Sequence, residues 1–497
     1  MPPTAEPIAL ERLFLDWKVP GRPFSQRLQA GVAAVAAVGA VVLGDFPAPG
    51  VNLVVVALAM AVLVVAAAWS SGRVLHQGRF NRTGVLFGVL AFALVSVAAF
   101  RDAPWIVALC LVLAAPTASY AAAGGRSWPE VLGGGVSLPL AMGRMVGWTS
   151  SGIGRSVTVG RGRTWPIART ALIVVVLLLV FGGLFAGADA AFRDVVEGLL
   201  PEISFGPMVG RAFVAFVTAL VALGLVFLVL APPPMRVLTP GKPKRAGRWA
   251  WAVPIAALDL LFLAFCVLQG SVLLAADKDK LLASTGLTYA EYARQGFFQL
   301  VVVTVLVLVV VAFAVRHAPI ASRRDRMLVR TLLGALCTLT LVVVAVALRR
   351  LYLYEETFGW TQLRLWVHAF ELWLGLVIVL VAAAGLKLKA SWLPRAVAAS
   401  GAAGLFALAA INPDAFIAER NVDRFEQTGK IDVYYLGGLS ADAVPALDRL
   451  PEPQRSCALD RIAAQLRKDR SAGAANLGRH RASEILESRP VVTSRSC

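Results

Sequence analysis

The segment LRRLYLYEETFGWTQLRLWVHAFELWLG, residues 348–375, decides the fold, because it places charged side chains between two apolar runs of membrane-spanning length. Its seven ionisable residues are Arg349, Arg350, Glu355, Glu356, Arg364, His368 and Glu371. From Arg364 onward the pattern predicts a helix that enters a bilayer, with Arg364, His368 and Glu371 at positions i, i+4 and i+7 on one face. A charged face at membrane depth is costly and usually faces other helices rather than lipid.

The composition of the whole chain is that of a membrane protein. Of its 497 residues, 58% are hydrophobic and only 16% are charged, whereas soluble domains average about 25% charged residues. The net charge of +18 would suggest a nucleic-acid partner in a soluble domain, but Arg-rich short loops also fix the orientation of helices in a membrane. We therefore expect a lipid bilayer as the partner and no nucleic acid.

Apolar runs long enough to cross a bilayer recur along the chain. A spanning helix needs about 20 apolar residues, so the sequence predicts an all-α, polytopic transmembrane helical bundle of about eleven spans. The predicted spans are 28–44, 51–69, 84–100, 104–123, 168–187, 208–231, 250–276, 297–315, 327–348, 363–385 and 394–411. They divide the chain into a cytoplasmic N-terminal segment at 1–27, a transmembrane domain at 28–411 and a polar, largely helical C-terminal region at 412–497.

The distribution of Lys and Arg predicts the orientation. Short cytoplasmic loops are normally the ones rich in these residues. The loops that a cytoplasmic N-terminus would place inside carry most of them, and the alternate loops carry few. We expect a bacterial cytoplasmic (inner) membrane protein with its N-terminus inside and residues 412–497 outside.

Two segments on the predicted cytoplasmic side differ in character. The segment ERLFLDW, residues 11–17, is predicted to lie as a short amphipathic helix at the membrane surface. Residues 124–167 are rich in Gly, Ser and Arg but match no phosphate-binding motif. They are interpreted as a flexible linker.

Residues 348–375 allow a structural and a functional interpretation. In the structural one, Arg349 and Arg350 extend to the membrane surface, and Arg364, His368 and Glu371 satisfy one another. In the functional one, Glu371 and His368 form a proton relay, or Glu355 and Arg364 bind a charged or sugar-like ligand. Asp259 is the other buried acid, with Arg364 and Arg211 as candidate partners.

Two further clusters are expected on the outer face. In residues 284–300, Thr288 and Glu291 form a capping box that indicates an anchor helix, and the functional alternative makes Glu291 and Arg294 site residues at a pocket mouth. Polar residues after position 411 are either a binding surface or caps and packing groups. They are Asp414, Arg420, Asn421, Asp432 and Tyr435.

Histidine and cysteine give little sign of metal chemistry. The four histidines fall in no H-E-x-x-H pattern and there is no C-x-x-C, so no metal and no cofactor are expected. Cys457 and Cys497 are the only cysteines predicted outside the membrane on the outer side. They are a candidate disulfide in an oxidising compartment, and the alternative is two unpaired thiols.

Several of these segments resemble a known family. They are LTYAEYARQGFFQL at 287–300, RRLYLYEETFGWTQLRLWVHAFELWLGLV at 349–377, NPDAFIAERNV at 412–422, YYLGGLSADAVPAL at 434–447 and FGGLFAGADAAFRDVV at 181–196. Together they resemble a bacterial integral-membrane family called domain of unknown function 4173 (DUF4173), over about residues 170–450. The resemblance implies a multi-span membrane protein and supplies no catalytic residues.

Three hypotheses of function follow from the sequence. A permease-like protein would use Asp259 and Glu371 within the bundle. A lipid-linked envelope enzyme of the glycosyltransferase type would use outer-face acids such as Glu291, Glu355 and Asp45. A membrane sensor or scaffold would bind an envelope or membrane protein through residues 412–497. No reaction can be read from the sequence, and whether the protein is an enzyme stays open.

Overall fold

The computed structural model describes a helical protein and confirms the predicted fold class. The described residues are 9–21, 23–45, 48–70, 82–156, 182, 205–239, 247–274, 297–319, 321–388, 390–469 and 475–491. Within them, ten helices are long and apolar enough to cross a membrane, and each matches one of the predicted spans. The remaining predicted span, 168–187, lies outside the described residues except for Gly182.

The chain forms two compact units. The first comprises Met1–Gly125, Pro129–Leu238 and Ile462–Pro490, and the second comprises Arg126–Trp128, Thr239–Arg461 and Val491–Cys497. The division at 1–27, 28–411 and 412–497 follows the composition of the sequence and stays a prediction.

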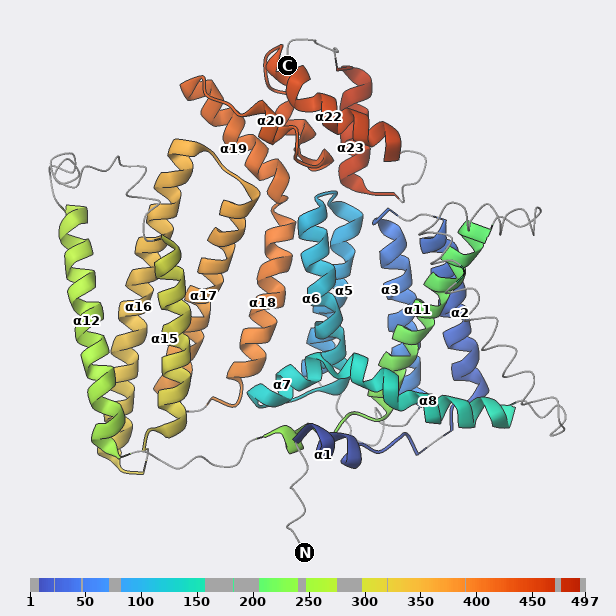
Figure 1. Cartoon of the computed structure of the whole chain (residues 1–497), viewed down its shortest axis with the longest axis horizontal. Helices are drawn as coiled ribbons and strands as arrows, with labels where there is room; N and C mark the ends of the chain where they lie inside the picture. Colours follow the sequence, from blue (N-terminus) through green and yellow to red (C-terminus); the bar gives the residue numbers. More distant parts are fainter. Residues whose placement is uncertain are drawn as a thin grey trace, which may run out of the picture. The chain divides into compact units, whose positions relative to one another are not determined.

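The first unit is a bundle of upright helices with a layer across one end. Its upright helices are α2 (Gln26–Gly44), α3 (Val51–Ser70), α5 (Arg82–Phe100), α6 (Pro104–Ala123) and α11 (Phe205–Leu230). Figure 1 shows them side by side, with α7 (Trp128–Gly135) and α8 (Ser137–Ser156) across one end. Close approach of α2 and α11 requires a small residue, because a Cβ on Gly39 would lie 2.5 Å from Oγ1 of Thr218.

The presence of α7 and α8 corrects the interpretation of residues 124–167 as a flexible linker over residues 128–156, whereas residues 157–167 lie outside the described part of the chain. On α8, Leu138, Ala141, Met145 and Trp148 are all buried and recur at helical spacing. Together they form one apolar face that packs on the bundle. Gly and Ser lower the helix propensity of this segment, but burial of that face outweighs the loss, because most helical stability in proteins comes from tertiary packing.

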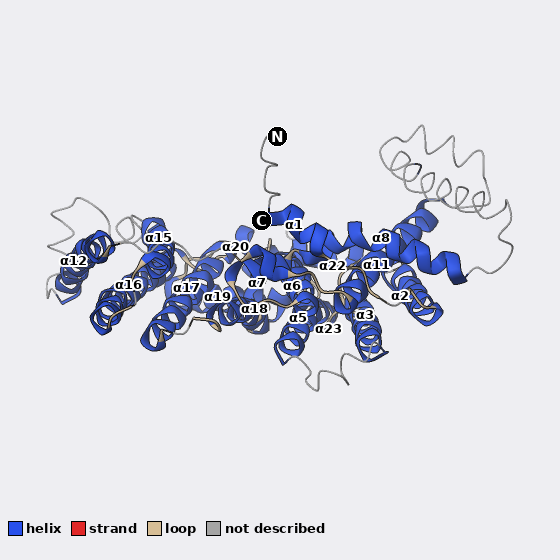
Figure 2. Ribbon diagram, turned by 90° about the horizontal axis from the view of Figure 1, so that it is seen from below, coloured by secondary structure: helices blue, strands red, loops and turns tan. Residues whose placement is uncertain are grey.

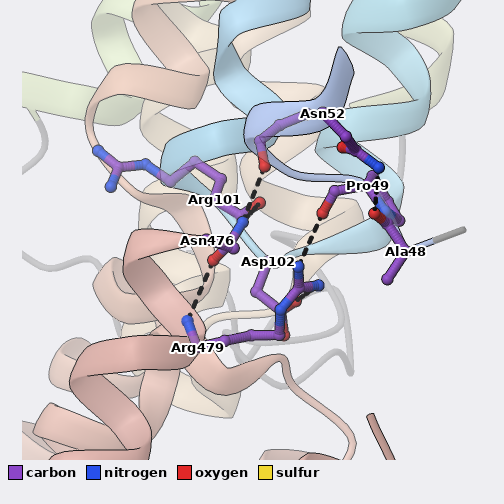
Figure 3. Close-up of polar contacts among 8 residues, drawn as sticks. Ala48, Pro49, Asn52, Arg101, Asp102, Asn476 and Arg479 are labelled. Atoms are coloured by element: carbon purple, nitrogen blue, oxygen red, sulfur yellow. Dashed lines mark hydrogen bonds and ion pairs between the residues drawn. The ribbon is translucent and has the colours of Figure 1, made fainter. Parts of the chain in front are cut away.

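The C-terminal helix α23 (Leu477–Ser488) is fastened to two turns of the first unit (Figure 3). The Asn476 side-chain amide donates hydrogen bonds to the backbone oxygens of Ala98 and Arg101, at 2.8 and 3.0 Å. Arg479 forms an ion pair with Asp102 at 3.1 Å and donates to the Pro49 oxygen at 2.9 Å. The end of the chain therefore joins the turn between α2 and α3 to the turn between α5 and α6.

Replacement of Asn476 should loosen this attachment. The same side chain caps α23 by accepting the Arg479 N–H at 3.1 Å, so Asn476→Ala removes a cap and two hydrogen bonds to backbone oxygens of the first unit. We expect a loss of roughly 2–4 kcal/mol in local stability, from the cap and the two hydrogen bonds together. Proteolysis of the C-terminal segment in the detergent-solubilised protein measures it. Gln465→Ala, which removes an exposed amide from α22, is the control. Equal cleavage rates for the two variants would contradict the attachment.

The second unit contains five helices of spanning length. They are α12 (Arg248–Leu274), α15 (Phe297–His317), α16 (Arg323–Phe358), α17 (Gln362–Lys387) and α18 (Leu393–Ala410). A 36-residue helix is about 54 Å long, whereas the hydrocarbon core of a bilayer is about 30 Å thick. The last turns of α16 therefore extend beyond the apolar part of the bundle. This result places Arg349 to Glu356 in a helix that continues past the predicted span at 327–348.

Short helices cover the end of the second unit where α16 finishes (Figure 1). They are α19 (Pro413–Thr428), α20 (Val433–Leu436), the 3-10 turn η2 (Ala441–Ala443), α21 (Val444–Leu447) and the first part of α22 (Gln454–Asp469). Pro413 begins α19 directly after Asn412, as predicted. At the opposite end of α16, Ser322 and Asp325 form a capping box, and Asp325 also binds Arg248 of α12 at 2.7 Å.

Candidate functional site

The candidate site lies where α16 turns into α17, inside the second unit. Gly359 caps α16 by donating its N–H to the Glu355 oxygen at 2.8 Å. Its φ of 80° lies in the left-handed region, which is open to glycine at little cost. Thr361 then caps α17, since its hydroxyl accepts the Arg364 N–H at 3.4 Å. The two helices are thereby held antiparallel with their polar residues facing each other.

Glu355 and His368 are brought together across this turn. The His368 Nδ1 lies 3.4 Å from each oxygen of the Glu355 carboxylate. The Glu355 side chain has no exposed surface, whereas the His368 side chain is 20% exposed. The pair is thus a buried acid whose imidazole partner retains some exposed surface. Among the residues that the structure describes, no three His, Cys, Asp or Glu side chains gather as ligands for a metal ion.

Aromatic and amide groups fix the position of the imidazole. Trp360 stacks on His368 with 5.9 Å between ring centroids and meets Phe416 of α19 edge-on at 5.1 Å. The Asn421 side-chain amide on α19 makes two hydrogen bonds to the backbone of Trp360. It accepts the Trp360 N–H at 3.2 Å and donates to the Trp360 oxygen at 2.9 Å. The short helix α19 therefore determines where the ring beside His368 lies.

Arg364 does not pair with His368 or Glu371 in the way that the structural interpretation expected. Its guanidinium donates to the Gly359 oxygen and lies 4.3 Å from the centroid of the Tyr354 ring. It therefore neutralises the carbonyl end of α16 and makes a cation–π contact, both of which stabilise the turn.

Glu371 lies about 10 Å further along α17 than Arg364, at a rise of 1.5 Å per residue. Its side chain is fully buried. One oxygen accepts a weak hydrogen bond from the Thr304 hydroxyl of α15 at 3.5 Å, and the other has no hydrogen-bond partner among the described residues. The His368 and Glu371 side chains share a face of α17 at positions i and i+3, which makes them neighbours. Glu355, His368 and Glu371 therefore form a polar series, which we call the relay.

Asp259 lies deeper in the same unit. It is eleven residues from the start of α12, about 16 Å along the helix and close to the middle of a bilayer. Both of its carboxylate oxygens are buried and lack a hydrogen-bond partner within the described part of the chain. Neither of its two candidate partners is used: Arg364 binds the turn, and Arg211 is ion-paired with Asp45 of the first unit.

The polar residues of the third predicted cluster mainly hold α19 and α20 in place. The buried Asp414 accepts hydrogen bonds from the Gln362 amide and the Ser440 N–H, both at 2.9 Å. The Tyr435 hydroxyl accepts the Gln362 N–H at 2.8 Å, and burial raises the pKa of this phenol above its ordinary value. Asp432 caps α20. These contacts agree with caps and packing rather than an open binding surface, although Arg420 is exposed beside Phe416.

Several predicted site residues lie outside the described part of the chain. They are Glu291, Arg294 and Cys497, so the pocket-mouth alternative and the pairing of Cys457 with Cys497 stay predictions. The sequence did not single out Thr304 or Trp360 as site residues. Thr304 is one hydroxyl in a run of valines and leucines, and only the packing of α15 against α17 identifies it.

The fold and the buried acids define a polytopic helical membrane protein. The family described as Domain of unknown function (DUF4153) matches residues 89–450, which is more than half of the chain, and the chain belongs to it. No curated protein and no solved structure matches the chain.

The family match corrects the resemblance to DUF4173. The five segments that suggested DUF4173 all lie within residues 89–450, the region that the DUF4153 family matches. The expectation of a family of unknown function holds.

Substitution of Gly359 should test how tightly α19 holds the turn. A Cβ at this position would clash with Oδ1 of Asn421, so Gly359→Ala adds a clash to the cost of its backbone conformation, with φ 80° and ψ 171°. Gly429 is the control for a positive φ alone, because its φ is 70° with ψ 3° and nothing lies within 4 Å of an added Cβ. We expect Gly429→Ala to cost about 1 kcal/mol and Gly359→Ala about 2–4 kcal/mol in unfolding free energy. Denaturant titration in detergent measures both. Equal losses would show that Asn421 exerts no constraint.

Proposed function

We propose that the protein is a permease-like membrane protein in which protons move through the second unit along the relay. In this function His368 exchanges protons with water at the end of the bundle, and Glu371 takes them into the apolar interior. Glu355 holds the imidazole in place. The observation that carries the proposal is the series of Glu355, His368 and Glu371, which runs from a partly exposed ring to a fully buried carboxyl group.

The energetic cost of these acids supports a functional role. A carboxyl group buried among apolar helices is expensive unless it is neutral or fully paired, and such groups usually mark ion or substrate pathways. Within the part of the chain that the structure describes, Glu371 has one weak hydrogen bond and Asp259 has none to its oxygens. A purely structural role would be met better by an apolar residue of similar volume, which would cost nothing to bury.

Imidazole is suited to the first position of such a path. Histidine is the side chain whose ordinary pKa lies nearest neutral pH, so it can bind and release a proton without a large free-energy change. His368 retains some exposed surface near the end of α17, whereas Glu371 has none. Asp259 gives the path a second carboxyl group near mid-bilayer, on a different helix. We place the exposed end of the relay on the extracytoplasmic side of a bacterial inner membrane, following the distribution of Lys and Arg in the loops.

The two other hypotheses have less support. A lipid-linked envelope enzyme needs an acid that a substrate can reach, but Glu355 has no exposed surface and Asp45 is held by Arg211. A sensor that binds an envelope or membrane protein partner needs a free surface on residues 412–497. Within that region, Asn476 and Arg479 are used to attach α23 to the first unit.

Proton movement in vesicles tests the proposal. The full chain is reconstituted in liposomes that contain a pH-sensitive dye, and the external medium is acidified while the membrane potential is clamped. We expect the wild-type protein to acidify the lumen, and Glu371→Gln to reduce the rate to that of protein-free vesicles. A Gln side chain keeps the size of Glu but cannot carry the proton.

Glu419→Gln is the matched control, because Glu419 is an exposed carboxylate on α19. It should acidify the lumen at the wild-type rate. His368→Gln should slow the flux as Glu371→Gln does. Equal rates for the wild-type protein and Glu371→Gln would refute the proposal.

A further inference from the structure

A layer of helices at one end of the first unit combines basic and apolar side chains. Figures 1 and 2 show α8 and α1 (Ala9–Asp16) at the end of the bundle where α2 begins. Trp17 joins this layer to the bundle, since its indole N–H donates to the Ala231 oxygen at 2.8 Å. The Arg144 guanidinium of α8 donates twice to the Trp17 oxygen, at 3.1 and 2.6 Å. The segment after α1 and the helix α8 are thus linked by side-chain contacts.

The outward surface of this layer exposes large apolar side chains, which is unfavourable in water. Leu15 is 70% exposed, Val19 is 51% exposed and Val146 is 62% exposed. The opposite faces are used for packing, with Leu13 and Trp148 buried. Helices that pack on one side and expose isolated apolar residues beside charges are typical of the boundary between lipid headgroups and acyl chains. The predicted surface position of residues 11–17 has the same basis.

A cavity opens between the two segments. Its volume is about 400 Å³, and Phe14, Val19, Gly143 and Arg144 line it. The lining therefore has an apolar wall from Phe14 and Val19 and a permanent positive charge from Arg144. Gly143 contributes no side chain, and nothing lies within 4 Å of a Cβ placed there. An occupant that fits both parts has an anionic group next to an apolar group.

The charges nearby favour an anion of the lipid type. Lys18 is exposed directly beside Val19, and Arg27 is exposed at the start of α2. A guanidinium binds phosphate oxygens with good geometry, and basic side chains at a membrane surface attract anionic headgroups. A free phosphate ion would use the charge but leave Phe14 and Val19 without a partner. A zwitterionic choline lipid would bring its own cation toward Lys18 and Arg144.

We propose that the cavity lined by Phe14, Val19, Gly143 and Arg144 binds the phosphate headgroup of an anionic phospholipid. The phosphate lies near Arg144 and Lys18, and the glycerol and first methylene groups lie against Phe14 and Val19. The site belongs to the first unit and does not depend on the relay. It gives the end of the bundle where α2 begins a specific lipid ligand in addition to its general contact with the membrane.

Native mass spectrometry of the detergent-purified full chain tests this site. Phosphatidylglycerol and phosphatidylcholine are added separately at equal concentrations. We expect a retained phosphatidylglycerol adduct and little phosphatidylcholine. Gly143→Leu fills the cavity without changing the charge or the Arg144–Trp17 contact, and it should reduce phosphatidylglycerol retention roughly tenfold, which corresponds to about 1.4 kcal/mol.

Gly147→Leu is the matched control. Gly147 lies one turn further along α8, outside the cavity, and nothing lies within 4 Å of an added Cβ. It should bind phosphatidylglycerol as the wild type does. Lys18→Gln removes one charge without touching the Arg144 contact and should weaken binding severalfold, whereas Lys430→Gln, an equal charge change on an exposed residue of the second unit, should not.

Three results would overturn the proposal. One is equal retention of the two lipids, and another is unchanged phosphatidylglycerol binding by Gly143→Leu. The third is displacement of phosphatidylglycerol by an excess of inorganic phosphate, which would show that the site recognises the ion alone and that Phe14 and Val19 add nothing.

Discussion

The placement of ionisable side chains inside an apolar helical unit is the constraint on which the second unit depends. Glu355 has no exposed surface and is tolerated because the turn between α16 and α17 brings His368 to within 3.4 Å of both of its oxygens. The turn requires a glycine at positive φ, Gly359, and the two hydrogen bonds between Asn421 and the Trp360 backbone. The short helix α19 thereby controls the geometry of the contact between Glu355 and His368.

The same constraint separates the acids by role. Asp414 is buried, but it accepts hydrogen bonds from donors in two other segments. Its role is therefore to hold α19 in place. Among the described residues, Glu371 has only the weak hydrogen bond from Thr304, and the Asp259 oxygens have no donor, so local hydrogen bonds there offset little of the cost of burial. Incomplete pairing distinguishes a group that can change its protonation from one that serves packing. This distinction is the physical basis for assigning the relay rather than the Asp414 cluster to function.

The sequence predicts the class of fold well because the length of an apolar run can be read directly from the local sequence. Ten described helices correspond to apolar runs that can be counted directly. The helix α8 was missed because its apolar face, Leu138 to Trp148, alternates with Gly143, Arg144 and Gly147 and becomes visible only when packed. The sequence predicted only part of the relay. The spacing of His368 and Glu371 shows that they share a face, but contacts between different helices, Glu355 with His368 and Thr304 with Glu371, depend on packing that no periodicity specifies.

The proposed function requires Glu355, His368 and Glu371 to act as one connected series. The chain has only four histidines, so nitrogen-15 labelling of histidine gives a spectrum in which His368 can be assigned by its loss in His368→Gln. Solid-state NMR of the protein in lipid bilayers then follows the ring nitrogens of His368. We expect Glu355→Gln and Glu371→Gln each to shift these signals, because the His368 Nδ1 lies 3.4 Å from the Glu355 carboxylate and Glu371 is its neighbour on the same face of α17. Unchanged His368 signals in Glu371→Gln, with the other three histidines also unaffected, would contradict the relay.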